Sequence, residues 1–283
     1  MIKPSELPLA ADGSLYHIHL TSDTLADKVL LVGDPDRVDM FKGIFDSVEH
    51  ESRNRELHAL TGRYHGTRMT ALSTGMGCDN IDIVMTELDV AADGRPLQLV
   101  RIGTSGSLQE EIDCGSYVAA AYAIGIDGLM NYYKEWGETK SQRVEETKME
   151  EAFNSQFSIL NSQLPTHPYC VQGSRLLLDK IATDMHHGIT ATAPGFYGPQ
   201  GRTVRLHPSI DNLNDKLAAF RYDGLPVTNL EMETSAIYGF SHLLGHDALT
   251  VCLIIANRPK GTFLNDYHEP MRQLVGTVVE RLK

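Results

Sequence analysis

Residues 29–37 read VLLVGDPDR, an apolar run of four residues that ends in a glycine and leads into a polar segment. A short apolar run that closes on turn residues is typical of a buried strand. Gly33 would let the backbone approach a ligand closely, and a helix that starts here would offer free N–H groups to an anion. The stretch therefore predicts a strand, a tight turn and a helix start, with Arg37 as a further donor. An N-capped helix start with an incidental arginine is the alternative.

The same alternation of apolar runs and helix-period segments continues along the chain. Further strands are predicted at 69–73, 99–102, 117–122 and 249–256, and helices at 81–88, 236–244 and 271–282. Alternating strands and helices favour an α/β fold with a mostly parallel or mixed sheet that helices cover. In such folds ligands gather at the carboxyl ends of strands, which is where the Gly-rich segments of this chain fall.

We expect a single domain over residues 1–283, because the sequence has no internal repeat and no low-complexity linker. Residues 132–165 are polar and rich in Lys, Glu, Gln and Ser, so this region is expected to be an insertion or a solvated face. Within it, residues 145–152 read as an exposed helix.

Composition excludes several classes of protein. A hydrophobic content of 42% over 283 residues suits a sizeable core, and no apolar run approaches the length of a membrane span. The four cysteines are widely spaced without a CxxC, and the N-terminus lacks a signal-peptide pattern, so a reducing cytoplasm is expected. The net charge of −12 argues against a nucleic-acid partner, although a few converging arginines could still bind a small anion.

Residues 195–202, GFYGPQGR, combine an aromatic ring, an amide and a guanidinium on a backbone with three glycines. A ring can stack on a flat ligand, the Gln200 amide offers both a donor and an acceptor, and Arg202 offers a rigid fork of donors. The edge of a pyrimidine-dione, with two carbonyl acceptors around one N–H donor, is complementary to this set. The alternative is a polar surface turn.

Two further segments carry charge in unusual places. Residues 101–106, RIGTSG, place an arginine inside an apolar strand, which is costly unless the arginine is paired. The hydroxyls that follow suit phosphate or ribose oxygens, and an arginine buried against a structural carboxylate is the alternative. Residues 229–234, NLEMET, bracket a methionine with two carboxylates, which are common acceptors for sugar diols but are also favoured at helix N-termini.

Other motifs carry less information or are missing. Residues 53–56, RNRE, form a small basic cluster that could equally be a solvated turn, and the paired histidines of residues 16–20, YHIHL, have no partner cluster that would make a metal site. The sequence contains no GxGxxG after the first strand, no P-loop and no GxSxG. These absences argue against a dinucleotide dehydrogenase, a P-loop enzyme and an α/β-hydrolase.

Taken in order, the segments GDPDR, RIGTSG, FYxxQGR and EMET resemble the nucleoside phosphorylase family with the hexameric bacterial-type fold, and within it the members that cleave uridine. The resemblance covers nearly the whole chain, from about Tyr16 to the C-terminal helix. It implies a single-domain, three-layer α/β/α fold with a central mixed, partly barrel-like sheet covered by helices.

The resemblance also implies a set of site residues. The phosphate cradle would consist of Gly33, Arg37, Arg101 and Thr104, and Arg55 would reach the phosphate of the neighbouring subunit. Those of the ribose site are Met232 and Glu233, with Glu231 beside them and His17 crossing a dimer interface to the 5′-hydroxyl. Those of the base pocket are Phe196, Gln200, Arg202, Ile254 and Ile255, together with Ser105 and Gly106. The catalytic roles fall to Arg202, Gln200, Glu233 and Arg101.

The activity that this resemblance implies is the reversible phosphorolysis of uridine, with phosphate as co-substrate and no organic cofactor. Purine-specific relatives carry a Ser-Asp pair where this chain has Asn257-Arg258, so the acid that protonates a purine is missing. A nucleosidase, a broader or purine-specific phosphorylase, and a nucleoside-binding protein without catalysis remain alternatives.

The resemblance further implies that a homodimer is the minimum active unit. It also allows a hexamer built from three such dimers. Family members often bind a monovalent cation such as K⁺ between subunits. The glutamate of that site matches Glu56, near Met76, but Asn80 takes the place of its serine, which leaves the cation an open question.

Overall fold

The computed structural model describes residues 2–156, 164 and 166–283. Its strands are β1 Lys28–Val32, β2 Ser47–Asn54, β3 Leu57–Tyr64, β4 Thr67–Ser73, β5 Gln98–Ser107, β6 Tyr117–Gly125, β7 Tyr169–Gln172, β8 His186–Thr192, β9 Arg221–Tyr222, β10 Leu225–Glu231, β11 Asp247–Asn257 and β12 Thr262–Phe263. Its α-helices are α1 Pro35–Val38, α2 Cys78–Ala92, α3 Lys134–Glu138, α4 Val144–Gln156, α6 Arg175–Ile181, α7 Leu213–Ala219, α8 Thr234–Leu244 and α9 His268–Leu282. Short 3₁₀ turns lie at Asp39–Gly43, Leu129–Tyr132, Thr139–Ser141 and Gly198–Gln200.

The strands form one mixed sheet that closes on itself over part of its length. Within the described residues the order is β12-β11-β6-β8-β10-β5-β1-β4-β3-β2. Strand β11 also pairs with β5, in parallel, so that β11, β6, β8, β10 and β5 complete a ring. The sheet contains both parallel pairs, such as β1 with β5, and antiparallel pairs, such as β10 with β5. The expectation of a mixed, partly barrel-like sheet is confirmed.

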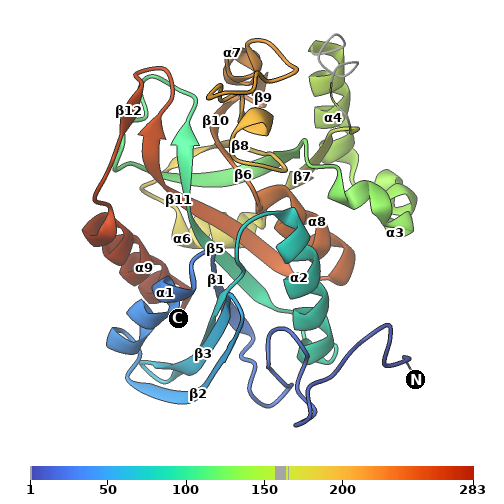
Figure 1. The fold of residues 1–283 in the computed structure, drawn as a ribbon, viewed down its shortest axis with the longest axis vertical. Helices are drawn as coiled ribbons and strands as arrows, with labels where there is room; N and C mark the ends of the chain where they lie inside the picture. The colour runs from blue at the N-terminus through green and yellow to red at the C-terminus, as the bar shows by residue number, and fades with distance from the viewer. Residues whose placement is uncertain (1, 157–163, 165) are drawn as a thin grey trace.

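Helices cover the sheet on two sides (Figure 1). Apolar residues of α1, α6 and α9 belong to one buried cluster, and those of α2 and α8 belong to another. In α9 the residues at helical spacing are fully buried, among them Met271, Leu274 and Val278. The amphipathic stripe that predicts this helix is therefore the face that packs on the sheet. The expected three layers are present.

Strand β5 is longer than its apolar run predicts. The run 99–102 predicts a strand that ends at Gly103, but the strand continues to Ser107 because the small residues pair with β11 and β10. The reason for the glycine is steric. A Cβ at position 103 would lie 2.0 Å from Nη1 of Arg101, whose side chain folds back over the strand. Residues 101–106 are therefore part of a strand and not a turn.

The polar region 132–165 is more closely packed than its composition predicts. The prediction of an exposed helix at 145–152 is wrong for one face of α4, where Glu146, Met149 and Phe153 are buried. The guanidinium of Arg143 lies 3.4 Å from the centre of the Trp136 ring, and both side chains are buried. Other charged residues, such as Glu145, Lys148 and Glu151, are exposed on the opposite face. Residues 157–163 and 165 lie outside the described part of the chain.

In the described part of the chain, none of the helices combines the length and the apolarity needed to span a bilayer.

Candidate active site

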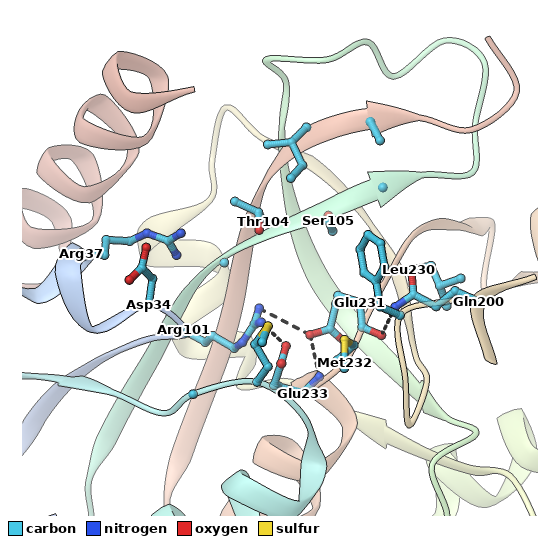
Figure 2. A pocket seen from close by; sticks show the side chains of 18 of the residues that line it. Asp34, Arg37, Arg101, Thr104, Ser105, Gln200, Leu230, Glu231, Met232 and Glu233 are labelled. Carbon is cyan, nitrogen blue, oxygen red and sulfur yellow. Dashed lines mark hydrogen bonds and ion pairs between the residues drawn. The ribbon is translucent and has the colours of Figure 1, made fainter. Parts of the chain in front are cut away.

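A cavity of about 630 Å³ opens where the carboxyl ends of β1 and β10 meet the second half of β5. Figure 2 shows Arg37 and Asp34 at one end, Gln200 at the other, and Arg101 with Glu233 between them. The predicted site residues that line this cavity are Gly33, Arg37, Arg101, Thr104, Ser105, Gly106, Phe196, Gln200, Arg202, Glu231, Met232, Glu233 and Ile255. The fold thus gathers residues from five separate segments of the sequence.

One end of the cavity is cationic. Arg37, in α1, is buried and donates from Nη1 to the carbonyl oxygen of Ile102 at 3.1 Å. No carboxylate of the described residues forms a salt bridge with it within 4.0 Å. Burial lowers the pKa of Arg37 below its ordinary value, and nearby Asp34 opposes this change in part. A buried arginine with free donors facing a cavity suits an anionic ligand.

Arg101 supplies the second cation and is paired. Its guanidinium is hydrogen-bonded to Glu233 through Nη2 and lies 3.4 Å from Glu231 Oε2 through Nη1. Burial alone would lower the pKa of Arg101, but the two carboxylates together raise it above its ordinary value. Its Nε is buried without a hydrogen-bond partner among the described residues. Arg101 therefore fits both interpretations of its sequence position. It is paired with buried carboxylates, and its Nε is still available as a donor to a ligand.

The two glutamates differ in what surrounds them. Glu233 accepts a hydrogen bond from the backbone N–H of Gly77 at 2.7 Å in addition to the bond from Arg101. Burial raises the pKa of Glu233, Arg101 opposes this effect, and the neighbouring Glu231 adds to it. Met232 lies between them in the sequence and also lines the cavity. The carboxylate of Glu233 is thus held beside Arg101 in the middle of the cavity (Figure 2).

The opposite end of the cavity is formed by the loop 196–202. Arg202 donates from Nη1 to Gln200 Oε1 at 2.6 Å and also to the carbonyl of Phe196, and its guanidinium lies 3.8 Å from the centre of the Phe196 ring. The Gln200 side chain is buried. A ring, an amide and a guanidinium therefore form one preassembled group, as a flat ligand with polar edges requires.

A second arginine lies behind this group. Arg258 donates from Nη2 to the carbonyl of Gln200 at 3.3 Å. Burial, with a further contribution from Arg258, lowers the pKa of Arg202 to about 10, so that Arg202 remains charged at neutral pH. The neighbouring Asn257 is buried and donates to the carbonyls of Gln109, Glu110 and Ile112. Asn257 thus has a structural role, and this position contributes no acid to the cavity.

The structure corrects one predicted base contact. Ile254 does not line the cavity but is fully buried with Ile112 and Val118. The pairing of β11 with β5 shifts register between Ile254 and Ala256, so that Ile255 is an extra residue on its strand. This bulge directs both Ile255 and Ala256 to the cavity.

His17 and Arg55 lie together, outside the cavity of their own chain. Arg55 occupies the turn between β2 and β3, with a φ of 55°, and is exposed. The side chain of Asn54 donates to the carbonyls of Tyr16 and His17, at 2.9 and 3.2 Å, and so joins the two segments. The His17 ring is fixed by a contact of 2.6 Å between Nδ1 and the buried carboxylate of Glu87.

A model of the phosphorylase superfamily matches residues 27–280, which is nearly the whole chain. The chain belongs to this superfamily. It is an enzyme of the nucleoside phosphorylase family.

Among the relatives of this phosphorylase is uridine phosphorylase of Thermococcus kodakarensis, 30% identical over 92% of this chain and 83% of the relative. A DeoD-type purine nucleoside phosphorylase of Alkaliphilus metalliredigens is 27% identical over 84% and 85% of the two chains. A nucleoside phosphorylase of Trypanosoma brucei, described as showing uridine phosphorylase activity, superposes with a TM-score of 0.87 at 29% identity, covering 98% of this chain and 99% of the other.

The residues expected at a cation site gather at the edge of the phosphorylase cavity. Glu56, Met76 and Asn80 all line it. The Asn80 amide donates from Nδ2 to the carbonyl oxygen of Met76 at 3.1 Å. A cation at these residues stays a prediction, and no step of the chemistry below depends on it.

The sequence motifs miss several residues of the phosphorylase cavity. Phe263 and Tyr267 line it from β12 and from the turn before α9, and Ala256 lines it from β11. Phe263 reaches the site because β12 folds back on β11, with Phe263 paired to Ala256. Nothing in the local sequence marks these residues, since their place depends on how the last strands pair.

Proposed function

We propose that this protein is a uridine phosphorylase, which converts uridine and phosphate reversibly into uracil and ribose 1-phosphate. The observation that supports it best is the order of groups along one cavity. Arg37 lies at one end, Arg101 and Glu233 are in the middle, and Gln200 with Arg202 lies at the other end. This order matches the order of phosphate, ribose and uracil in the reacting pair of substrates.

In this proposal phosphate binds between Arg37 and Arg101. A guanidinium has five N–H donors, so Arg101 can remain paired with a carboxylate while other donors, including Nε, meet phosphate oxygens. Thr104 adds a hydroxyl to the same end of the cavity. The attraction between buried charges is strong at short range, which lets a chain with a net charge of −12 bind an anion locally.

The chemical step breaks the bond between ribose C1′ and uracil N1, and the bonding electrons leave with the uracil. A phosphate oxygen then forms the new bond to C1′ from the opposite face, through an oxocarbenium-like sugar. Glu233 accepts from the ribose 2′- and 3′-hydroxyls and holds the sugar in place. Gln200 and Arg202 meet the carbonyls on which the charge of the leaving uracil develops. The enzyme acts by positioning and electrostatics, without a covalent nucleophile.

The proposal includes a second copy of the chain. His17 and Arg55 are joined through Asn54 on one surface, and neither lines the cavity of its own chain. We assign them to the site of a partner subunit, where Arg55 would meet the phosphate and His17 the ribose 5′-hydroxyl. A homodimer is then the smallest complete enzyme.

The decisive experiment measures uracil release from uridine with and without inorganic phosphate. A uridine phosphorylase releases uracil only when phosphate is present and forms ribose 1-phosphate in equal amount. Equal rates in both conditions would identify a nucleosidase, and no release in either condition would contradict an enzymatic role on uridine.

Inosine in the same assay tests a purine phosphorylase. We expect uridine to be preferred, because Asn257 and Arg258 provide no acid for a purine leaving group. A higher kcat/KM with inosine would overturn the assignment of the base.

A further inference from the structure

Glu231 has the surroundings of a structural carboxylate although it touches the cavity. It is buried with an exposed fraction of 4%, and its carboxylate accepts hydrogen bonds on both oxygens. Thr192 Oγ1 donates to Oε1 at 2.6 Å, and the backbone N–H of Glu233 donates to Oε2 at 2.9 Å. The backbone N–H of Thr234 lies 3.1 and 3.0 Å from the two oxygens.

These bonds replace a missing helix cap. Glu233 is the N-cap residue of α8, yet its side chain makes no capping hydrogen bond. An N-cap side chain ordinarily accepts from the free N–H groups of the first turn. Here Glu231 accepts from the N–H groups of Glu233 and Thr234, and Thr192 Oγ1 accepts from that of Ser235. The side chain of Glu233 points away toward Gly77 and Arg101. Glu231 and Thr192 thus share the capping of the first turn, which leaves the Glu233 carboxylate for the cavity.

Glu231 is also tied to the residues on either side of it. Its Oε2 lies 3.4 Å from Nη1 of Arg101 (Figure 2), and its backbone oxygen accepts from the N–H of Ala193 at 2.9 Å. Thr192 Oγ1, which donates to Glu231, accepts in turn from the N–H of Ser235 in α8. The carboxylate therefore connects β8, β5 and the first turn of α8 in one buried network.

We propose that Glu231 is a positioning residue that sets the orientation of Glu233, and not a ligand of the ribose. A carboxylate that already accepts from three donors, one of them shared between both oxygens, and also faces a guanidinium has little capacity left for sugar hydroxyls. This inference rests on the proposed function for the role of Glu233, and it gives Glu231, which the resemblance places beside the ribose contacts, a role that does not require contact with the sugar.

A double-mutant cycle with Glu231→Gln and Glu233→Ala tests the proposal. In a Gln side chain one oxygen becomes NH₂, which would face at least one N–H donor of α8 whichever way the amide turns. We expect E231Q alone to lower kcat/KM for uridine about 30-fold, and to lower it less than about threefold in the E233A background. If the two effects multiply, Glu231 contacts the substrate independently and the proposal is wrong.

Thr192 provides a second test that leaves both carboxylates in place. Thr192→Val removes the hydroxyl that donates to Glu231 and should lower kcat/KM about tenfold, whereas Thr192→Ser should stay within about threefold of the wild type. Glu146→Gln is the matched control for a buried carboxylate changed to an amide, because Glu146 lies in α4 and does not line the cavity. Wild-type activity in T192V, or an equal loss in T192S, would contradict the proposal.

The test of Glu231 can succeed or fail independently of the test of the proposed function. If the wild type releases no uracil with phosphate, the proposed function fails. The same cycle is then run on the affinities for uridine and inosine, measured by calorimetry, because both nucleosides carry the ribose that Glu233 would bind. Non-additive losses in affinity would support the positioning role, and additive losses would overturn it.

Discussion

Arg202 makes three contacts that together define what it can do for a ligand. Its Nη1 donates to Gln200 Oε1 and to the Phe196 carbonyl, and its plane covers the Phe196 ring. The guanidinium and the amide are thus already oriented toward each other, so little reorganisation is needed when charge develops on a bound uracil. The cost of placing a half-buried cation beside Arg258 is visible in its lowered pKa.

Replacing Arg202 by alanine should lower kcat for uridine by about 100-fold, because one oriented donor to the leaving group is lost. Arg205→Ala is the matched control, since Arg205 is exposed and does not line the active-site cavity, although both arginines line a neighbouring one. Steady-state kinetics at saturating phosphate measure the effect, and circular dichroism checks the fold. Near-wild-type kcat in the Arg202 variant would remove the leaving-group role.

At the scale of elements, strand β5 carries the middle of the site. Its glycine at position 103 is required by the side chain of Arg101, which would lie 2.0 Å from an added Cβ, whereas a Cβ at Gly106 would meet Arg258 at 3.6 Å and Ala256 at 3.8 Å. Within β5, position 103 therefore leaves no room for a side chain, whereas position 106 has room for a methyl group.

Gly103→Ala should therefore displace the Arg101 guanidinium and raise the KM for phosphate about tenfold or more, with the sheet intact. Gly106→Ala is the control from the same strand and should leave the KM for phosphate unchanged, because its contact is an ordinary van der Waals distance. Phosphate titrations at saturating uridine compare the two. A similar phosphate KM in both variants would show that Arg101 does not need the space.

We expect the turn between α8 and β11 to make the stability of the protein depend on pH. His246 is buried there, and its Nδ1 accepts from the N–H of Leu97 at 3.3 Å, just before β5. Burial lowers the pKa of His246 below its ordinary value of 6.5, with Asp89 opposing in part. The unfolded chain therefore binds a proton more readily than the folded one, so the stabilisation is present above about pH 6.5 and is lost as the pH falls below it.

We expect Tm to fall between about pH 7.5 and pH 5.5, and His246→Asn to make this fall shallower. Asparagine keeps an acceptor for the Leu97 N–H but does not titrate. Thermal unfolding of both proteins across this range measures the difference. Parallel pH profiles of Tm would show that His246 does not contribute.

Apolar periodicity predicts elements such as β1 and α9 because burial itself causes the pattern. It does not predict the second half of β5, since Gly, Thr and Ser are typical of turns and only the pairing with β11 makes them a strand. The same limit explains Ile254 and Ile255, because two adjacent isoleucines give no sign of a bulge. The double role of Glu231 is equally hidden, since two glutamates near a helix start look alike in a sequence.

At the scale of the whole molecule, distant segments of one chain complete a single cavity, with Arg37 at one end and the loop 196–202 at the other, while His17 and Arg55 lie outside it. Motif resemblance placed these two residues in a partner's site, and the fold gives a physical reason to retain that proposal. Asn54 holds both on one surface, and Glu87 anchors the His17 segment with bonds to the N–H groups of His17 and Ile18. A His17 ring that is held outside its own cavity is available to act on a neighbouring one.

Subunit mixing tests this directly. Arg55→Ala and Arg101→Ala should each be nearly inactive alone, but co-expression should restore about a quarter of wild-type activity, since half of randomly formed dimers are mixed and each mixed dimer has one complete site. The control pair, Arg37→Ala with Arg101→Ala, should restore nothing, because both residues belong to the same chain's cavity and every site lacks one of them. If Arg55 acts within its own chain, the first pair will be as inactive as the control.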